Sequence, residues 1–512
     1  MRKKGTPILL VLALLLCFEG LPSARKVVCW GSTSNPETMD PAQAWDDVSV
    51  FFATNIFETL VRLNPETFDI EPSLALSWEA KKQGKMWVFK LRRNVKFHDG
   101  SDFDARAVVF SFRRQLDRKC KFRYFDFLPF EEIFRNIKSV VAVDSHTVVF
   151  HLRDPFYPFL SSLSSSGASI ISPIAVRKHK AEFFQNPVGT GPFKLKSWDK
   201  SERIVLEANP EYWKGKAGFD EFIYRIIPKH DQLHKLFRQG DIDILDSVSI
   251  SRTVGLKNVK WATIHKTPAL SVNFIVFNFK NKYLQNENIR RAIKYAWDDR
   301  VLKYIFQDFV VPLKSVIPQG IPGYRDILAR REFSIPKSRE LLDREQIHEK
   351  IRLVFVLHND SSLEKQVVQL FSKNLNRVGI ELNIQCVSGE EYKKKIEQGL
   401  FDLTISGWIA DYPDSHNILS ALFNVQYQAG GFANLSGYQD KELRRIINKI
   451  AIESNVWTRQ NMIERIIREI DDKTLCIPIY QQTYVYIYNN KLIEKVRISL
   501  NGNIELFNIV KK

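Results

Sequence analysis

Alternation of hydrophobic and polar residues predicts several strands in this chain. Residues 86–91 alternate with a period of two, as half-buried strands do. Residues 140–143 and 147–152 are two further apolar runs, joined by turn residues at 144–146, and this pattern predicts a hairpin. Further strands are expected at 204–207, 222–227 and 477–488.

A second periodicity, with apolar side chains every three or four positions, predicts helices. It runs through 288–305 and through 363–378, where Gly379 is expected to end the helix. It returns over 440–472. Because helix and strand patterns are mixed along the whole chain, the predicted fold class is α/β.

One part of the pattern predicts a β-α-β unit. Apolar runs at 351–357 and 380–387 flank the helix predicted at 363–378. A shorter helix, predicted at 391–397, precedes another apolar run at 402–406, which we expect to be the next strand of the same sheet. In open α/β sheets ligands gather at the carboxyl ends of strands, so the residues after 406 are candidates for binding.

The residues after this strand combine a glycine, two aromatic rings and a carboxylate. Gly407 and Trp408 are followed by Asp411 and Tyr412. A glycine lets another backbone approach closely, and the rings supply flat apolar walls. Around Asp411 this combination favours a pocket for a positively charged group on an extended chain. The alternative is a plain strand that ends in a turn at Pro413.

Length and composition narrow the class of protein. The chain has 512 residues, too many for one hydrophobic core, so two or more domains are expected. Hydrophobic residues make up 44% and charged residues 26%, as in ordinary soluble proteins. The formal net charge is +17, but the basic residues are scattered and no nucleic-acid-binding motif occurs. We therefore interpret the charge as a solvated face and expect no nucleic acid partner.

The N-terminus has the pattern of an export signal. Basic residues at 2–4 precede an apolar run at 8–18, which is too short to span a bilayer. Cleavage after Ala24 would remove three basic residues and one acidic residue and leave a net charge of +15. Lipid attachment at Cys17 would require a small residue before it, whereas Leu16 is large. We therefore expect a periplasmic protein and favour one without a lipid anchor.

The cysteine pattern gives no reason to predict a metal or another cofactor. Cys29, Cys120, Cys386 and Cys476 remain after the export signal, and they are far apart in sequence. An oxidising compartment permits disulfides, but the spacing does not pair them. Cys386 and Cys476 lie in apolar, strand-like runs and are expected to be buried free thiols.

Seven segments resemble the family-5 extracytoplasmic solute-binding proteins, and they follow the family's order. These proteins are the peptide-, nickel- and oligosaccharide-binding components of ABC importers. The segments are 71–78 (EPSLALSW), 89–111, 189–193 (GTGPF), 209–213 (NPEYW), 240–243 (GDID), 286–299 and 401–414 (FDLTISGWIADYPD). One such match is unspecific, whereas seven collinear matches across the mature chain are specific.

The resemblance implies a large class II periplasmic binding-protein fold, with two lobes that close over a ligand about a hinge. Lobe one would comprise residues 25–267 and 485–512, with an inserted subdomain at about 50–182, and lobe two residues 268–484. The two crossing strands would pass between the lobes near 268–270 and 481–483. Such a protein captures peptides as a monomer, delivers them to an ABC permease and is not an enzyme.

The resemblance also implies a mode of binding. In the family's peptide binders the ligand lies extended between two protein strands, and an aspartate after Gly-Trp pairs with its α-ammonium. That aspartate corresponds to Asp411. The expected ligand-binding residues are Gly407, Trp408, Ile409, Asp411 and Tyr412 on one side, and Ser32, Thr33 and Ser34 on the other. Main-chain hydrogen bonds accept many peptide sequences, while the charge pair fixes the register.

Two positions depart from the family's peptide binders. Gly389 stands where many of them carry tryptophan, and Ile405 stands where oligopeptide binders tend to carry arginine. The loss of a ring and a cation leaves peptide length and side-chain preference open. No residue is assigned to a ligand carboxylate, because Lys393 to Lys395 are expected to be a solvated helix face.

Two alternatives remain at this point. The same fold could bind a nickel chelate, haem or an oligosaccharide, although clustered histidines for a metal are absent from the sequence. An exported hydrolase would use Asp411 and Asp414 as paired carboxylates. Two carboxylates within one turn, without a G-x-S-x-G or H-E-x-x-H motif, disfavour that second alternative.

Overall fold

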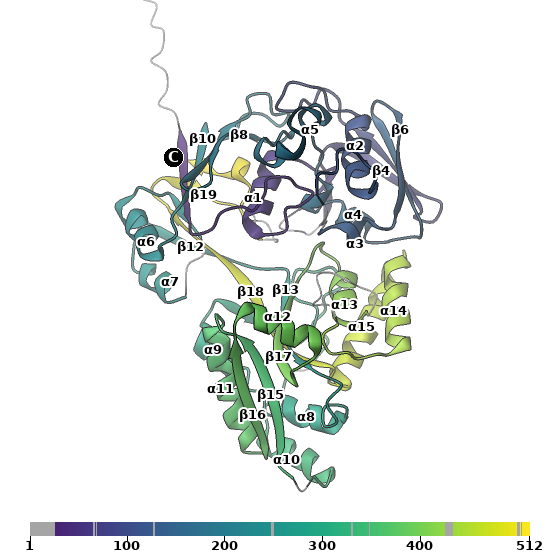
Figure 1. Cartoon of the computed structure of the whole chain (residues 1–512), viewed down its shortest axis with the longest axis vertical. Helices are drawn as coiled ribbons and strands as arrows, with labels where there is room; N and C mark the ends of the chain where they lie inside the picture. Colours follow the sequence, from purple (N-terminus) through teal and green to yellow (C-terminus); the bar gives the residue numbers. More distant parts are fainter. Residues whose placement is uncertain are drawn as a thin grey trace, which may run out of the picture.

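The computed structural model describes residues 26–512, except 65, 66, 68, 126–128, 247–249, 329–330, 348, 425–433, 499–501 and 503. The predicted export signal and Cys17 lie outside the described residues. Figure 1 shows two lobes: the upper one, lobe one, is built from the N-terminal part of the chain and its last residues, and the lower one, lobe two, from the part between them. This arrangement confirms the predicted α/β, two-lobed fold. No helix in the described residues is long and apolar enough to cross a membrane.

The upper lobe contains one half of a large mixed sheet and a smaller separate sheet. Its strands in the large sheet are β1 (Val27–Ser32), β8 (Phe193–Asp199), β9 (Arg203–Ala208), β10 (Glu221–Ile226), β11 (Ile244–Leu245) and β12 (Ala262–Pro268). The smaller sheet consists of β4 (Ala75–Lys81), β5 (Met86–Leu91), β6 (Ile137–Asp144) and β7 (Thr147–Leu152). Short strands pair as β2 (Val61–Leu63) with β3 (Ile70–Pro72), and β19 (Ile493–Lys495) with β20 (Val510–Lys511).

Helices of the upper lobe pack on these sheets. They are α1 (Asp47–Ile56), α2 (Ala105–Leu116), α3 (Glu131–Phe134), α4 (Phe159–Ser162), α5 (Pro173–His179), α6 (His230–Gln239) and α7 (Ile250–Leu256). Asp46 caps α1 and Asp104 caps α2, each by accepting a backbone hydrogen bond from the first turn. The small sheet and α2 have their own core, built around Phe89, Phe112 and Phe150.

The lower lobe repeats the pattern of strands covered by helices. Its strands are β13 (Ser271–Phe277), β14 (Val310–Pro312), β15 (Ile351–His358), β16 (Ile380–Val387) and β17 (Leu403–Ile409). Its helices are α8 (Glu287–Tyr295), α9 (Arg300–Phe306), α10 (Ile335–Arg344), α11 (Ser362–Asn376), α12 (Gly389–Gln398), α13 (Ser415–Phe423), α14 (Lys441–Ile452) and α15 (Val456–Asp472). As predicted, β15 runs parallel to both β16 and β17.

Strand β18 (Cys476–Asn489) runs from one lobe into the other (Figure 1). It pairs with β13 at Cys476–Tyr480 and with β12 at Thr483–Asn489. The change of partner falls where the family resemblance implies the two crossings, at 268–270 and 481–483. The limits of the lobes and of the inserted subdomain stay predictions.

Most predicted elements are confirmed, and one helix is wrong. Strands β5 and β7 have the predicted bounds, and α11 ends before Gly379, whose φ is +85°. The predicted helix 288–305 is instead two helices, α8 and α9. The chain turns between them at Trp297, which is buried against Phe371 of α11 and donates from Nε1 to Asp299 at 2.7 Å. All four cysteines in the described residues are free thiols, with Cys476 buried and Cys386 half-buried.

Candidate ligand-binding site

The strand β17 has one edge that no described strand fully covers. Its pairing with β13 extends from Leu403 to Ile409, but β15 pairs only with Leu403 and Thr404. The other edge is therefore unpaired from Ile405 onward, and Gly407 and Ile409 are exposed. Unpaired backbone groups on an exposed edge can bind an extended chain by β-strand addition.

Asp411 follows this edge and is oriented by Asn417, a fully buried residue in the first turn of α13. Asn417 Oδ1 accepts hydrogen bonds from Trp408 Nε1 at 2.9 Å and from the Asp411 backbone at 3.2 Å. Its Nδ2 donates to Asp411 Oδ2 at 2.9 Å. One amide therefore holds the strand end, the ring and the carboxylate together. No sequence pattern singles out Asn417.

Asp411 and Tyr412 line a cavity of about 340 Å³ together with residues of lobe one. This volume lies within the range of small-molecule sites. Asp411 is exposed, whereas Tyr412 is only 3% exposed and packs in the core of the small sheet. The Tyr412 hydroxyl lies 3.1 Å from His416 Nδ1, and its ring contacts Phe156 at 6.2 Å between centroids. Tyr412 therefore joins the lobes as well as lining the cavity.

The opposite wall of the cavity contains a buried carboxylate, Glu58. It accepts hydrogen bonds from Thr190 Oγ1 at 2.9 Å, Tyr212 Oη at 2.9 Å and Trp213 Nε1 at 2.8 Å. Burial raises the pKa of Glu58, against the opposing effects of Lys214 and the three donors. Thr190 reaches Glu58 because Gly189 and Gly191 pass close to the backbone of α1; a Cβ at Gly191 would lie 2.6 Å from the Ile56 carbonyl.

Three cations line the same cavity: Arg62, Lys214 and Arg497. Arg62 pairs with Glu71 at 2.8 Å, and Lys214 Nζ lies 3.8 Å from Glu58 Oε1. Burial lowers the pKa of Lys214, and Arg62 and Arg92 lower it further, while Glu58 and Glu505 oppose the shift. Sequence reasoning did not select these cations, because they come from three distant segments.

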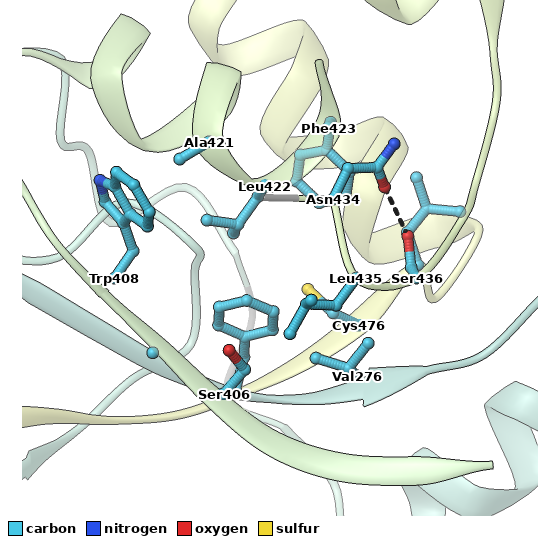
Figure 2. A pocket seen from close by; sticks show the side chains of 13 residues that line it. Val276, Ser406, Trp408, Ala421, Leu422, Phe423, Asn434, Leu435, Ser436 and Cys476 are labelled. Atoms are coloured by element: carbon cyan, nitrogen blue, oxygen red, sulfur yellow. Dashed lines mark hydrogen bonds between the residues drawn. The ribbon is translucent and has the colours of Figure 1, made fainter. Parts of the chain in front are cut away.

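Of the remaining predicted residues, Gly407 and Trp408 line a second, smaller pocket of about 20 Å³. Figure 2 shows the Trp408 ring at one side of this pocket, with Ala421 and Leu422 of α13 around it. Ile409 is 45% exposed on β17, and neither pocket includes it.

Ser32, Thr33 and Ser34 lie at the carboxyl end of β1 and line neither of these two pockets. Ser32 is fully buried: its Oγ accepts from the Ser34 backbone at 3.2 Å, and its carbonyl accepts from Ile227 at 2.7 Å. Tyr224 Oη donates to the Ser34 carbonyl at 3.0 Å.

The region that lacks the family's tryptophan is occupied by a histidine and a tyrosine. A Cβ at Gly389 would lie 3.0 Å from His358 Nε2, and the His358 and Tyr392 rings lie 6.0 Å apart. The Tyr392 hydroxyl donates to the Ile405 carbonyl at 3.2 Å. Lys393 and Lys395 pair with glutamates of their own helix, at 3.9 and 3.7 Å.

Asp414 is a structural residue rather than half of a catalytic pair. It caps α13 by accepting from the His416 backbone at 2.8 Å, and it accepts from Arg459 Nη2 at 2.5 Å. Both side chains of this ion pair are almost fully buried. Among the residues that the structure describes, no three His, Cys, Asp or Glu side chains gather as a metal site.

Comparison with known proteins finds full-length relatives. The chain is 27% identical to the probable D,D-dipeptide-binding periplasmic protein DdpA of Escherichia coli (strain K12), over 95% of both chains. It is 25% identical to the dipeptide-binding protein of the same strain, over 95% of this chain and 92% of the relative. It is 26% identical to heme-binding protein A of Haemophilus influenzae, over 90% and 88%.

Solved structures share the fold. DppA from Helicobacter pylori, in complex with the peptide STSA, is 27% identical with a TM-score of 0.77, over 95% of this chain and 98% of that one. HbpA2 from Haemophilus parasuis, 23% identical, has a TM-score of 0.87 over 95% and 100%. Residues 69–429 match the family described as "Bacterial extracellular solute-binding proteins, family 5 Middle". The chain belongs to this family of bacterial extracellular solute-binding proteins.

Proposed function

We propose that this solute-binding protein captures peptides between its two lobes and delivers them to an ABC import permease. The observation that carries the proposal is the unpaired edge of β17, which ends at an exposed carboxylate held by Asn417. An extended peptide adds to such an edge through its main chain, whatever its sequence. The α-ammonium of the peptide then pairs with Asp411. Relatives named for dipeptide and D,D-dipeptide binding support this ligand class.

Isothermal titration calorimetry with short peptides tests the proposal. We expect wild-type protein to bind a free dipeptide or tripeptide, and Asp411→Asn to weaken that binding at least about thirtyfold, because removing one partner of a buried charge pair costs about 2–5 kcal/mol. N-acetylation of the peptide removes the other partner. In Asp411→Asn the acetylated and free peptides should therefore bind about equally well.

A matched control is Asp326→Asn, which removes an exposed lobe-two carboxylate that pairs with Lys314 at 3.1 Å outside the cavity. This variant should bind peptides as the wild type does. Peptide binding that is unchanged in Asp411→Asn would contradict the ammonium pairing. Binding of haem or a metal chelate in preference to every peptide would contradict the ligand class.

The proposal extends to the location and partners of the protein. Residues 1–24 act as an export signal, and the mature protein works in the periplasm as a monomer, without catalytic activity of its own. Relatives named as periplasmic binding proteins support this part of the proposal. N-terminal sequencing of the protein from the periplasmic fraction should start at Arg25, and light scattering should give the mass of one chain.

A further inference from the structure

One cation in the cavity wall has no hydrogen-bond acceptor among the residues that the structure describes. Lys214 Nζ lies 3.8 Å from Glu58 Oε1, beyond hydrogen-bond distance, and its side chain is only 24% exposed. The ammonium also lies 4.5 Å from the centre of the Trp213 ring. Glu58 gives this ammonium a counter-charge but no hydrogen bond, so its donors favour an anion that comes from outside the protein.

A second cation of the same wall, Arg62, also has a hydrogen-bond donor without an acceptor among the described residues. Arg62 donates to Glu71 through Nη2, but its buried Nε has no partner among the described residues. Arg62 and Arg92 both act on Lys214 and disfavour its charged form. An anion bound beside Lys214 would relieve this repulsion as well as accept its hydrogen bonds.

The carboxylates of lobe one give Lys214 a counter-charge, Glu58 at 3.8 Å, but no hydrogen-bond acceptor. Glu58 is 8% exposed on its side chain and already accepts from Thr190, Tyr212 and Trp213. Glu505 accepts a hydrogen bond from Asn508. Lobe one therefore lines the cavity with three basic groups and with two carboxylates, Glu58 and Glu505, that already accept hydrogen bonds within the protein, and lobe two lines it with Asp411.

We propose that the wall formed by Lys214 and Arg62 is a subsite for a carboxylate on the first residue of the ligand. The inference rests on the proposed function, in which Asp411 takes the ammonium of that residue. One residue would then place its positive group on lobe two and its negative group on lobe one. Two kinds of peptide have this chemistry: those that start with an α-linked acidic residue, and those that start with a γ-linked glutamate, which keeps its α-carboxylate beside the amine.

Calorimetry with four dipeptides separates the possibilities. The probes are Glu-Ala, its neutral isostere Gln-Ala, γ-Glu-Ala and Ala-Ala. We expect the wild type to bind Glu-Ala or γ-Glu-Ala at least about tenfold more tightly than Gln-Ala and Ala-Ala, as a charge-assisted hydrogen bond in a partly buried site allows. The stronger of the two acidic peptides identifies the source of the carboxylate.

The variant Lys214→Gln should reduce this preference to less than about threefold while it still binds Ala-Ala. Lys194→Gln is a matched control, because Lys194 is also part-exposed in lobe one (31%) and lies 3.4 Å from Glu207, outside the cavity lining. It should keep the full preference. The comparison of the four peptides on wild-type protein remains decisive if Lys214→Gln does not fold.

The outcomes distinguish this inference from the proposed function. Equal binding of Glu-Ala, γ-Glu-Ala and Gln-Ala by the wild type would overturn the subsite and leave peptide binding intact. A full preference that persists in folded Lys214→Gln would also overturn it. Failure to bind any of the four dipeptides, or any longer free peptide, would overturn both.

Discussion

Asp411 and Glu58 are two carboxylates in the walls of one cavity, and their surroundings are opposite. Asp411 is exposed at the end of a strand and is oriented by the side chain of a neighbour six positions away. Glu58 is buried and binds three side chains from segments more than 130 residues distant. Asp411 is exposed where it lines the cavity, whereas the oxygens of Glu58 accept hydrogen bonds from the protein itself. This difference separates a group that binds a ligand from a group that holds the wall.

The difference has an energetic consequence. A buried carboxylate with several donors contributes to folding, and its loss leaves those donors unsatisfied. An exposed carboxylate at a strand end contributes little to folding, because water at its exposed position can accept the hydrogen bond of Asn417 Nδ2 in its place. Substitution of Glu58 should therefore lower mainly the stability of the protein, and substitution of Asp411 mainly its affinity for the ligand.

The largest expected effect is on stability, in Glu58→Ala. The change leaves the donors of Thr190, Tyr212 and Trp213 without an acceptor and Lys214 without its counter-charge. We expect the free energy of unfolding, from a denaturant titration, to fall by about 3–5 kcal/mol. Asp411→Ala should change it by less than about 1 kcal/mol.

Glu58→Gln is the control for this prediction. It keeps an oxygen acceptor of the same size, so its loss of stability should be clearly smaller than that of Glu58→Ala. Equal losses in Glu58→Ala and Asp411→Ala would remove the distinction between the two carboxylates.

The strand that carries Asp411 could be predicted from sequence, and its partners could not. Apolar periodicity and short connections predicted 402–406 as the next strand of the sheet that contains 351–357 and 380–387, and the structure pairs β17 with β15. Asp411 followed from its place at the strand end. Asn417 could not be predicted in this way, since nothing in the sequence distinguishes a buried asparagine in a helix from an exposed one.

The lobe-one wall was beyond sequence reasoning for a different reason. Glu58, Lys214 and Arg497 line one cavity only because the tertiary fold brings their segments together, and no sequence pattern selects any of the three as a binding residue. The predicted helix 288–305 also has no local signal for its interruption: it contains no Gly or Pro, and the buried ring of Trp297 at the break packs against Phe371 of the distant α11. Local sequence patterns therefore predicted most helices and strands. The lobe-one wall of the site depends on contacts between distant segments, which such patterns do not contain.

A smaller effect is expected from pH, at the boundary between the two lobes. Burial lowers the pKa of His416 to about 4. Its ring contacts Tyr412, Ser420 and Phe156, and the charges of Asp414, Arg459 and Arg135 act on it. Because the unfolded chain takes up this proton near pH 6.5, stability should be complete above pH 6.5 and decline as the pH falls toward 4.

The expected contribution of His416 is a loss of about 2 kcal/mol of unfolding free energy between pH 7 and pH 4.5. His416→Gln cannot take up a proton, so it should lose correspondingly less stability over the same range. Parallel pH profiles for wild type and variant would show that His416 does not titrate between the folded and unfolded states.

The smallest expected change in stability tests the residue at which orientation and packing meet, Asn417. Asn417→Leu keeps the number and branching of the side-chain heavy atoms but leaves Trp408 Nε1 and the Asp411 backbone without their acceptor. We expect a loss of about 1–2 kcal/mol in unfolding free energy. The carboxylate also loses the donor that aims it, so peptide affinity should fall about tenfold.

Asn278→Leu is the matched control for Asn417→Leu. Asn278 is also buried in lobe two, and its Nδ2 donates to the Phe401 carbonyl at 2.6 Å, at the opposite end of β17. The control should lose a similar amount of stability and keep its peptide affinity, because Asp411 remains oriented. If both variants bind peptide equally well, Asp411 needs no fixed orientation to bind the ligand. Asp411 and Glu58 would then differ in function only because one carboxylate is exposed and the other is buried.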